Sequence, residues 1–378
     1  MFRTIFAFSA ITLMLTSCGI PNPPLQVRTL AAAGCVDSHS TEAWRDPSSL
    51  YFAASNLPDC REKRVNFTNF RGSGVFLGQS IISGNVATHD VAHHTQFLDK
   101  TEWLASIREE ATKSGGLLVF IHGFNNSYED AVSRAELVRR LYETEHPAVV
   151  LVWPSRQKAQ SYIYDEASVA WAQDYMNQAL SDLVKQTSDI TIVAHSMGGR
   201  AAIAAVEHVD LTAPEEASHI RKIALVAPDI DRHRVLRSGG AVERLLNHGR
   251  DVIVYTSQRD WPIRASRILH GYSRLGSSDC RYSVDYERRS GGRYGKCHRI
   301  DPANRERLRV VETSFARGES FLRHANVFDT CVGRDDLRAF VQDLEDPPWR
   351  KIETNVADDG LIGWYLDPTL HRELRGTC

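Results

Sequence analysis

The sequence predicts an α/β fold in which helices cover both faces of a mostly parallel central sheet. From residue 117 onward, short β-branched runs alternate with helical segments, as expected when parallel strands are joined through helices. Within this alternation, the run 190–194 leads through Ser196 into a small, alanine-rich segment, which predicts a buried strand that turns sharply into a helix.

The elements follow from the spacing of apolar, β-branched and small residues. Residues 31–60 look irregular, whereas 64–70 and 74–82 alternate with aromatic and β-branched side chains, which is typical of strands. Further strands are expected at 117–121, 148–153, 190–194, 222–226, 251–256 and 308–313. Helices are expected at 101–114, 128–145, 159–186, 197–208, 234–248 and 335–344.

One polar segment interrupts this order. Residues 271–307 are rich in arginine, glycine and tyrosine, so we expect an insertion near the site, not an apolar lid. The predicted organisation has four parts, which are a signal peptide (1–17), a tether with an irregular segment (18–62), the α/β domain with its insertion (63–346) and a C-terminal extension (347–378).

The composition is that of a globular enzyme. The chain has 378 residues, of which 42% are hydrophobic and 24% charged, and this is enough to bury a large core. A net charge of −2 gives no reason to expect nucleic-acid binding. No apolar run after the first 15 residues is long enough to span a bilayer.

The start of the chain predicts export. Arg3 precedes an apolar run over 5–15, and small residues then lead to Cys18, which together resemble a bacterial lipoprotein signal. By this resemblance Cys18 would be lipidated and would anchor the chain in the cell envelope. Gly19 in place of aspartate favours the outer membrane, facing the periplasm. The alternative is an ordinary cleaved signal with an incidental cysteine.

Six further cysteines suggest disulfides, because their number is even and the chain is expected to be exported. Pairing by sequence neighbours predicts Cys35–Cys60, Cys280–Cys297 and Cys331–Cys378. The alternative is that some of them are buried free thiols.

Ser196 is the candidate nucleophile. Small residues at Ala194 and Gly198 permit a tight strand-to-helix turn that exposes the serine hydroxyl. A serine needs a base and an acid that orients the base, and in this arrangement they follow in the order serine, acid, histidine.

Asp260, which follows the strand 251–256, is the expected acid, and His324, which follows the strand 308–313, is the expected base. Asp260 could instead be a helix cap only, with Asp229 or Asp231 as the alternative acid. His298 and His371 are the alternative bases, and His195 is interpreted as structural.

An acyl-transfer site also needs donors for a developing oxyanion. The strand 117–121 ends in His122-Gly123-Phe124, so the Phe124 N–H is one expected donor. The Met197 N–H, at the start of the helix after Ser196, is the other.

Five segments together resemble a bacterial family of α/β hydrolases of unknown function, grouped with esterases and lipases. They are 119–126 (Val-Phe-Ile-His-Gly-Phe-Asn-Asn), 153–155 (Trp-Pro-Ser), 194–199 (Ala-His-Ser-Met-Gly-Gly), 227–231 (Ala-Pro-Asp-Ile-Asp) and 274–276 (Arg-Leu-Gly). The resemblance covers roughly residues 67–344 and implies an α/β-hydrolase fold and a Ser/Asp/His triad without metal or cofactor. In this chain Arg323 precedes His324, where the family pattern predicts a glycine.

The sequence therefore predicts a serine hydrolase that cleaves a carboxylic ester of a small molecule or lipid through an acyl-enzyme. An amidase, a thioesterase and a catalytically silent envelope scaffold are the alternatives. The histidines at 89, 93 and 94 with Asp90 could be a metal cluster, but no matching ligands occur elsewhere, so a polar loop is expected there.

Overall fold

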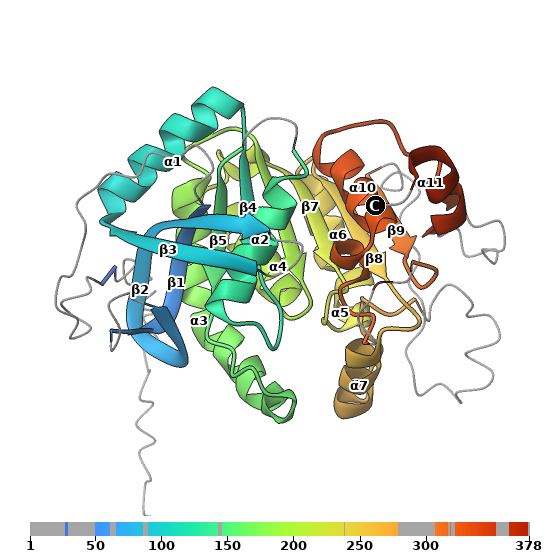
Figure 1. Ribbon diagram of the computed structural model, residues 1–378, viewed down its shortest axis with the longest axis horizontal. Coiled ribbons are helices and arrows are strands. Elements are labelled where there is room, and N and C mark those ends of the chain that lie inside the picture. Colours follow the sequence, from blue (N-terminus) through green and yellow to red (C-terminus); the bar gives the residue numbers. More distant parts are fainter. Residues whose placement is uncertain are drawn as a thin grey trace, which may run out of the picture.

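The computed structural model describes residues 27–28, 50–60, 66–85, 90–142, 146–237, 239–278, 307–316, 318, 322–352 and 363–376. Within these ranges the strands form one eleven-stranded sheet in the order β10-β11-β9-β8-β7-β6-β4-β5-β1-β2-β3 (Figure 1). The centre of the sheet is parallel and consists of β4 (Leu117–Ile121), β5 (Ala148–Val152), β6 (Ile190–His195), β7 (Ile220–Val226), β8 (Asp251–Thr256) and β9 (Leu308–Glu312).

Two layers of helices cover the sheet, as the predicted fold class requires. One face packs against α1 (Lys100–Ser114), α3 (Tyr162–Leu183), α4 (Gly198–Thr212), α5 (Arg232–Leu236) and α6 (Ala241–Asn247). The other face packs against α2 (Tyr128–Arg139), α9 (Asn326–Asp329) and α10 (Cys331–Val341). The α/β prediction is confirmed, because apolar strands buried on both faces need a helical layer on each side.

The N-terminal part of the sheet corrects the predicted organisation. Residues 50–59 were expected to be irregular, but they form β1 (Leu50–Asp59), which lies parallel to β5 inside the sheet. The first five residues of β1 are apolar on both faces, so they lack the alternation by which a half-buried strand is recognised. The α/β domain therefore begins before residue 63.

Two antiparallel strands follow β1. Residues 66–70 and 74–82, from the two runs expected as early strands, belong to one long strand, β2 (Asn66–Asn85), which pairs with β3 (Asp90–Leu98) at the edge of the sheet. The prediction of a polar loop around residues 89–94 is wrong for 90–94, because these residues lie in β3. His89 lies outside the described residues.

The C-terminal residues also belong to the sheet. β11 (Gly363–Leu366) is parallel to β9 and β10 (Arg350–Ile352) is antiparallel to β11, so these residues of the expected C-terminal extension are part of the sheet. α11 (Pro368–Arg375) follows them. The single helix expected over 234–248 is two helices, α5 and α6. A side chain at Gly240, between them, would lie 2.4 Å from the Val235 carbonyl oxygen.

The remaining helices are α7 (Trp261–His270) and the short 3-10 helices η3 (Ala159–Ser161) and η4 (Ala217–His219). Among the helices described, none is both long and apolar enough to cross a bilayer. No cluster of three or more metal-ligating side chains is found in the described ranges.

Cys60 and Cys331 are both disulfide-bonded. The cysteines expected to pair with them, Cys35 and Cys378, lie outside the described residues, as do Cys280 and Cys297. The predicted pairing therefore stays a prediction.

Candidate active site

Ser196 lies in the sharp turn between β6 and α4. Its φ is +53°, a left-handed conformation that is uncommon for a residue other than glycine and costs about 1–2 kcal/mol. Three backbone hydrogen bonds hold the turn. The Ser196 N–H donates to Val226 at 2.9 Å, and the Ser196 carbonyl accepts from Gly199 and Asp229, both at 3.0 Å. Backbone strain held in this way at a serine is a feature of functional sites.

Two glycines let the neighbouring backbone approach this turn. A side chain at Gly123 would place its Cβ 2.7 Å from Ser196 Cβ, and one at Gly198 would lie 2.5 Å from the His122 carbonyl oxygen. Both separations are too short for any L side chain. Gly123 is thus needed for close approach to Ser196, and the positive φ in this loop, +61°, belongs to Asn125.

His324 and Asp260 meet at this edge of the sheet. His324 Nδ1 lies 2.7 Å from Asp260 Oδ2, and Asp260 is completely buried. Asp260 Oδ1 accepts the Ile263 N–H at 2.9 Å, so the carboxylate also caps the start of α7. The helix cap and the partner of the histidine were alternative roles for Asp260, and its carboxylate has both of them.

The electrostatics of His324 are governed by Asp260. Burial alone would lower the pKa of His324, but the charge of Asp260 and its hydrogen bond outweigh burial and raise that pKa above its ordinary value. Because the carboxylate faces Nδ1, the proton of neutral His324 is placed on Nδ1, which leaves Nε2 as the acceptor.

The backbone before His324 explains a departure from the family pattern. Arg323 has a φ of +54°, in the region that favours glycine. The position therefore keeps the conformation that a glycine would adopt easily, at a strain of about 1–2 kcal/mol.

His195 connects the Ser196 turn to the His324 loop. Its Nε2 lies 3.3 Å from the His324 carbonyl oxygen, and the two imidazole rings are 4.7 Å apart. Burial lowers the pKa of His195 well below its ordinary value, so the ring is neutral and donates from Nε2. The interpretation of His195 as structural agrees with these contacts, and the ring also packs on Phe328 at 5.6 Å.

The Phe124 and Met197 N–H groups have no hydrogen-bond acceptor among the residues that the structure describes. A buried backbone donor without a partner is rare, and Met197 is completely buried. Two hydrogen bonds hold the loop that carries Phe124. The Asn125 N–H donates to Ser155 Oγ at 2.9 Å, and the Asn126 side-chain amide donates to the Phe124 carbonyl within the loop at 2.7 Å.

His122 and Trp153 fix the base of this loop. The Trp153 N–H donates to His122 Nε2 at 3.1 Å, and His122 Nδ1 donates to the Gly123 carbonyl at 2.9 Å. The two rings are stacked with centroids 4.8 Å apart. Burial lowers the pKa of His122 to about 4, so it is neutral at ordinary pH. Sequence analysis missed this role, although the His-Gly-Phe and Trp-Pro-Ser segments both point to it.

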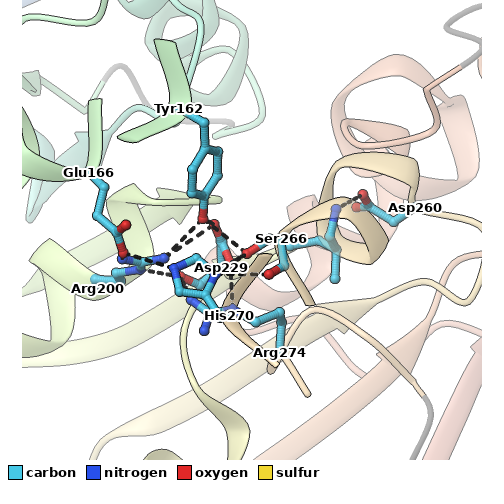
Figure 2. A network of polar contacts seen from close by, with 9 residues as sticks. Tyr162, Glu166, Arg200, Asp229, Asp260, Ser266, His270 and Arg274 are labelled. Atoms are coloured by element: carbon cyan, nitrogen blue, oxygen red, sulfur yellow. Dashed lines mark hydrogen bonds and ion pairs between the residues drawn. The ribbon is translucent and has the colours of Figure 1, made fainter. Parts of the chain in front are cut away.

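Asp229, an alternative acid, belongs to a different network. Arg274 Nε donates to Asp229 Oδ1 at 2.7 Å and Ser266 Oγ donates to the same oxygen at 2.6 Å (Figure 2). Burial would raise the pKa of Asp229, but the charges of Arg274 and Arg200 outweigh it and lower that pKa. Asp231, the other alternative, accepts the Arg234 N–H at 3.0 Å as the cap of α5.

Figure 2 shows that side chains from α3, α4 and α7 converge on this network. Tyr162 from α3 donates to Asp229, and its hydroxyl lies 3.0 Å from Ser266 Oγ of α7. Glu166 from α3 pairs with Arg200 of α4 and lies 3.1 Å from His270 Nε2 of α7. Sequence analysis missed these residues because they come from separate elements and carry no shared spacing.

Neither alternative base is placed at the Ser196 turn by the described residues. His371 is in α11, where its Nε2 lies 2.7 Å from Asp335 Oδ2 and its ring packs against Trp349. His298 lies outside the described residues. Of the residues singled out beforehand, the structure brings together Asp260 and His324, with His195 joining them to the turn at Ser196.

Comparison with known proteins identifies the family of the chain. The sequence profile of a family described as alpha/beta hydrolase of unknown function (DUF900) matches residues 97–298, which is more than half of the chain. The chain belongs to this family. The matched range contains Ser196 and Asp260, and His324 lies beyond it. No curated protein matches the chain significantly.

Among solved structures, the carboxylesterase EstE1 from a metagenomic library is 13% identical, with 71% of this chain and 86% of that chain covered, at a TM-score of 0.31. An esterase from Pyrobaculum calidifontis is also 13% identical, with 59% and 70% covered, at a TM-score of 0.28. A putative cell surface hydrolase from Lactobacillus plantarum is 10% identical, with 60% and 89% covered, at a TM-score of 0.27. Likenesses this distant carry no argument about the reaction of this α/β hydrolase.

Proposed function

We propose that this α/β hydrolase is a serine esterase, with Ser196 as nucleophile, His324 as general base and Asp260 as the group that orients His324. The observation that carries the proposal is the 2.7 Å contact between Asp260 and His324, whose carbonyl contacts His195, the residue before Ser196 in the strained strand-to-helix turn. A positioned histidine and a buried carboxylate are what a serine needs to become nucleophilic.

The reaction runs in two halves. Ser196 Oγ attacks the ester carbonyl carbon while its proton passes to His324 Nε2, and the carbonyl oxygen becomes an oxyanion. The Phe124 and Met197 N–H groups stabilise that oxyanion, which is consistent with their having no acceptor among the described residues. When the tetrahedral intermediate collapses, His324 protonates the departing alcohol and an acyl-Ser196 remains.

Water then releases the acyl group. His324 takes a proton from the water, the resulting oxygen attacks the acyl carbon, and Ser196 leaves with the proton that His324 returns. The products are a carboxylic acid and the free enzyme. None of these steps needs a metal or cofactor. Asp260 stays ionised and stabilises the positive charge that His324 carries in each transition state.

The proposal is tested by covalent labelling and by ester hydrolysis. A fluorophosphonate probe should label the wild-type chain and fail to label Ser196→Ala. Asp231→Asn is the matched control, because Asp231 accepts the Arg234 N–H as the cap of α5. Unchanged labelling of Ser196→Ala would exclude this mechanism, and an unlabelled wild-type chain without ester turnover would favour the scaffold alternative.

A graded substrate series defines the bond that is cleaved. We expect p-nitrophenyl esters to be hydrolysed faster than the matched anilides, with thioesters tested in parallel. A higher kcat/KM for the anilides would replace the esterase with an amidase that uses the same residues.

We also propose that the enzyme is held in the bacterial cell envelope by a lipid on Cys18. The support is the signal-like sequence before Cys18, which lies outside the described residues.

A further inference from the structure

Helix α7 directs Ser266 and His270 inward beside the buried Ile263, and it exposes most of its large apolar side chains. Ser266 and His270, one helical turn apart, turn inward and join the network around Asp229 and Glu166. Ile268 and Leu269, between them in sequence, face solvent with 79% and 54% of their surface exposed. A surface helix usually buries its apolar stripe and exposes its polar one. The reversal in α7 therefore needs a reason outside the hydrolase core.

The exposed apolar side chains form a continuous face on α7. Trp261 and Ile268 are seven residues apart, which places them on one side of α7, and Tyr272 follows the end of the helix at Gly271. Trp261 and Tyr272 are 50% and 59% exposed. We call Trp261, Ile268, Leu269 and Tyr272 the α7 face.

Two further exposed apolar residues border it. Leu322, 52% exposed, accepts the Trp261 N–H through its carbonyl, and Ile163, 68% exposed, follows Tyr162, which contacts Ser266 of α7. Figure 1 shows α7 and the start of α3 at the same end of the molecule.

The charges around the α7 face are positive. Arg259 and Arg264 are exposed and have no carboxylate partner among the residues that the structure describes. Arg264 lies over the Trp261 ring at 4.8 Å. Asp260, the neighbouring acid, is buried against His324, and Glu166, the acid closest to His270, is paired with Arg200. The face thus combines aromatic, aliphatic and arginine side chains, a combination typical of helices that lie in a membrane interface.

We propose that the α7 face docks on the surface of a bilayer that contains anionic phospholipid. Trp261, Ile268, Leu269 and Tyr272 enter the boundary between headgroups and acyl chains, and Arg259 and Arg264 contact the phosphates. Docking at this face brings the site to the lipid surface, because Trp261 follows Asp260 directly and Leu322 lies two residues before His324. The α7 face acts without Ser196 chemistry, so it does not rest on the proposed function.

Charge decides between a bilayer and the other possible occupants. A second copy of this chain would bring arginines of the same sign against Arg259 and Arg264, which is unfavourable. Residues 279–306, the segment that follows, contain seven basic and five acidic residues, so their charge does not favour covering this face. An anionic bilayer satisfies both the apolar and the basic side chains, and the lipoprotein-like start of the same chain is consistent with a membrane partner.

Vesicle flotation tests the docking surface. The full chain is used in a Cys18→Ser background, so that a lipid at residue 18 does not retain every variant. Ile268→Ser combined with Leu269→Ser should lower affinity for phosphatidylglycerol-containing vesicles by about 30-fold. The matched control combines Leu211→Ser with Leu374→Ser, which are exposed side chains on α4 and α11, and it should bind as the parent does.

Fluorescence reads the position of α7 itself. Bromine-labelled lipid should quench tryptophan emission of the parent, and Trp261→Phe should lose most of that quenching while it still binds. Trp103, Trp153 and Trp349 are buried and out of reach of lipid. Ser196→Ala should bind and be quenched like the parent, so failure of the esterase proposal and failure of docking are distinguishable.

Four outcomes would overturn the proposal. One is equal flotation of the α7 double variant and its control, and another is full quenching in Trp261→Phe. The third is that the parent protein does not bind vesicles but forms a dimer that the double variant does not form. This result would assign the α7 face to a second copy of the chain. Binding to phosphatidylcholine vesicles as tight as to anionic ones would remove the role of Arg259 and Arg264.

Discussion

Replacing Asp260 by asparagine separates the two roles that this carboxylate has in the structure. Its Oδ2 lies 2.7 Å from His324 Nδ1, and its Oδ1 accepts the Ile263 N–H at 2.9 Å. Asparagine has one carbonyl oxygen and caps a helix about as well as aspartate. With that oxygen kept at Ile263, the side-chain NH₂ faces His324 Nδ1 and favours the tautomer with its proton on Nε2.

In that tautomer His324 cannot accept the Ser196 proton. We expect kcat to fall by about 10⁴-fold, which corresponds to about 5.4 kcal/mol of transition-state stabilisation. The helix cap is kept, so the free energy of unfolding should change by less than about 1 kcal/mol. Initial rates on an activated ester and urea unfolding of the same preparation measure the two quantities.

Asp229→Asn is the matched control, because Asp229 is hydrogen-bonded to Arg274 in a buried network, and its charge helps to raise the pKa of His324 less than that of Asp260 does. Weakening that buried pair should cost roughly 3 kcal/mol of stability and much less rate, measured where the variant is folded. A larger loss of kcat in Asp229→Asn than in Asp260→Asn would move the acid to β7 and refute the assignment.

The pH dependence gives a second check on Asp260. The carboxylate outweighs burial and raises the pKa of His324, and the base works only when neutral, so the wild-type rate rises as pH increases through that raised pKa. Without the negative charge, the residual rate of Asp260→Asn should persist to lower pH. An acid limb at the same pH in both proteins would mean that Asp260 does not act on His324.

Three further predictions concern the loop before Ser196, the buried histidine and the anchor. Gly123→Ala should reduce kcat by at least about 100-fold, because its Cβ would lie 2.7 Å from Ser196 Cβ, whereas Gly115→Ala, with open space but a φ of +85°, should only lose about 1 kcal/mol of stability. Burial lowers the pKa of His122 from 6.5 to about 4, so its contribution to stability, about 3 kcal/mol, is present above pH 6.5 and is lost as pH falls towards 4. Urea unfolding at pH 7 and pH 4.5 should therefore show a smaller loss in His122→Asn, and an equal loss would contradict this account. Cys18→Ser should leave a soluble or unprocessed chain, and a processed mutant still in the membrane fraction would argue against a lipid at that residue.

Local patterns in the sequence were enough for the parallel strands at the centre of the sheet, β4 to β9. β4 and β8 begin and end where expected, because short β-branched runs bounded by polar residues leave little choice of strand limits. β1 was missed for the opposite reason, since its apolar run has no alternation and only pairing with β5 and β2 makes it a strand. β10 and β11 were missed because they are three and four residues long, too short for a period to emerge.

The site divides in the same way. The sequence by itself determined that Ser196 follows a strand and opens a helix, because the size of Ala194 and Gly198 is a local property of the turn. It also singled out Asp260 and His324, by their places after β8 and β9. Only the tertiary structure shows which of Asp260 and Asp229 contacts His324, because both follow parallel strands, and packing places Asp229 against arginine and Asp260 against His324.

The face that α7 presents was likewise beyond the sequence. Its pattern predicts an amphipathic helix, but such a pattern indicates only that one side is apolar and does not determine which side is buried. Ser266 and His270 face inward because Asp229, in the loop after β7, and Glu166 of α3 contact them there. Ile268 and Leu269 are exposed to solvent as a consequence. Local propensity sets the period of a helix, but its rotation about its own axis is set by the residues packed against it.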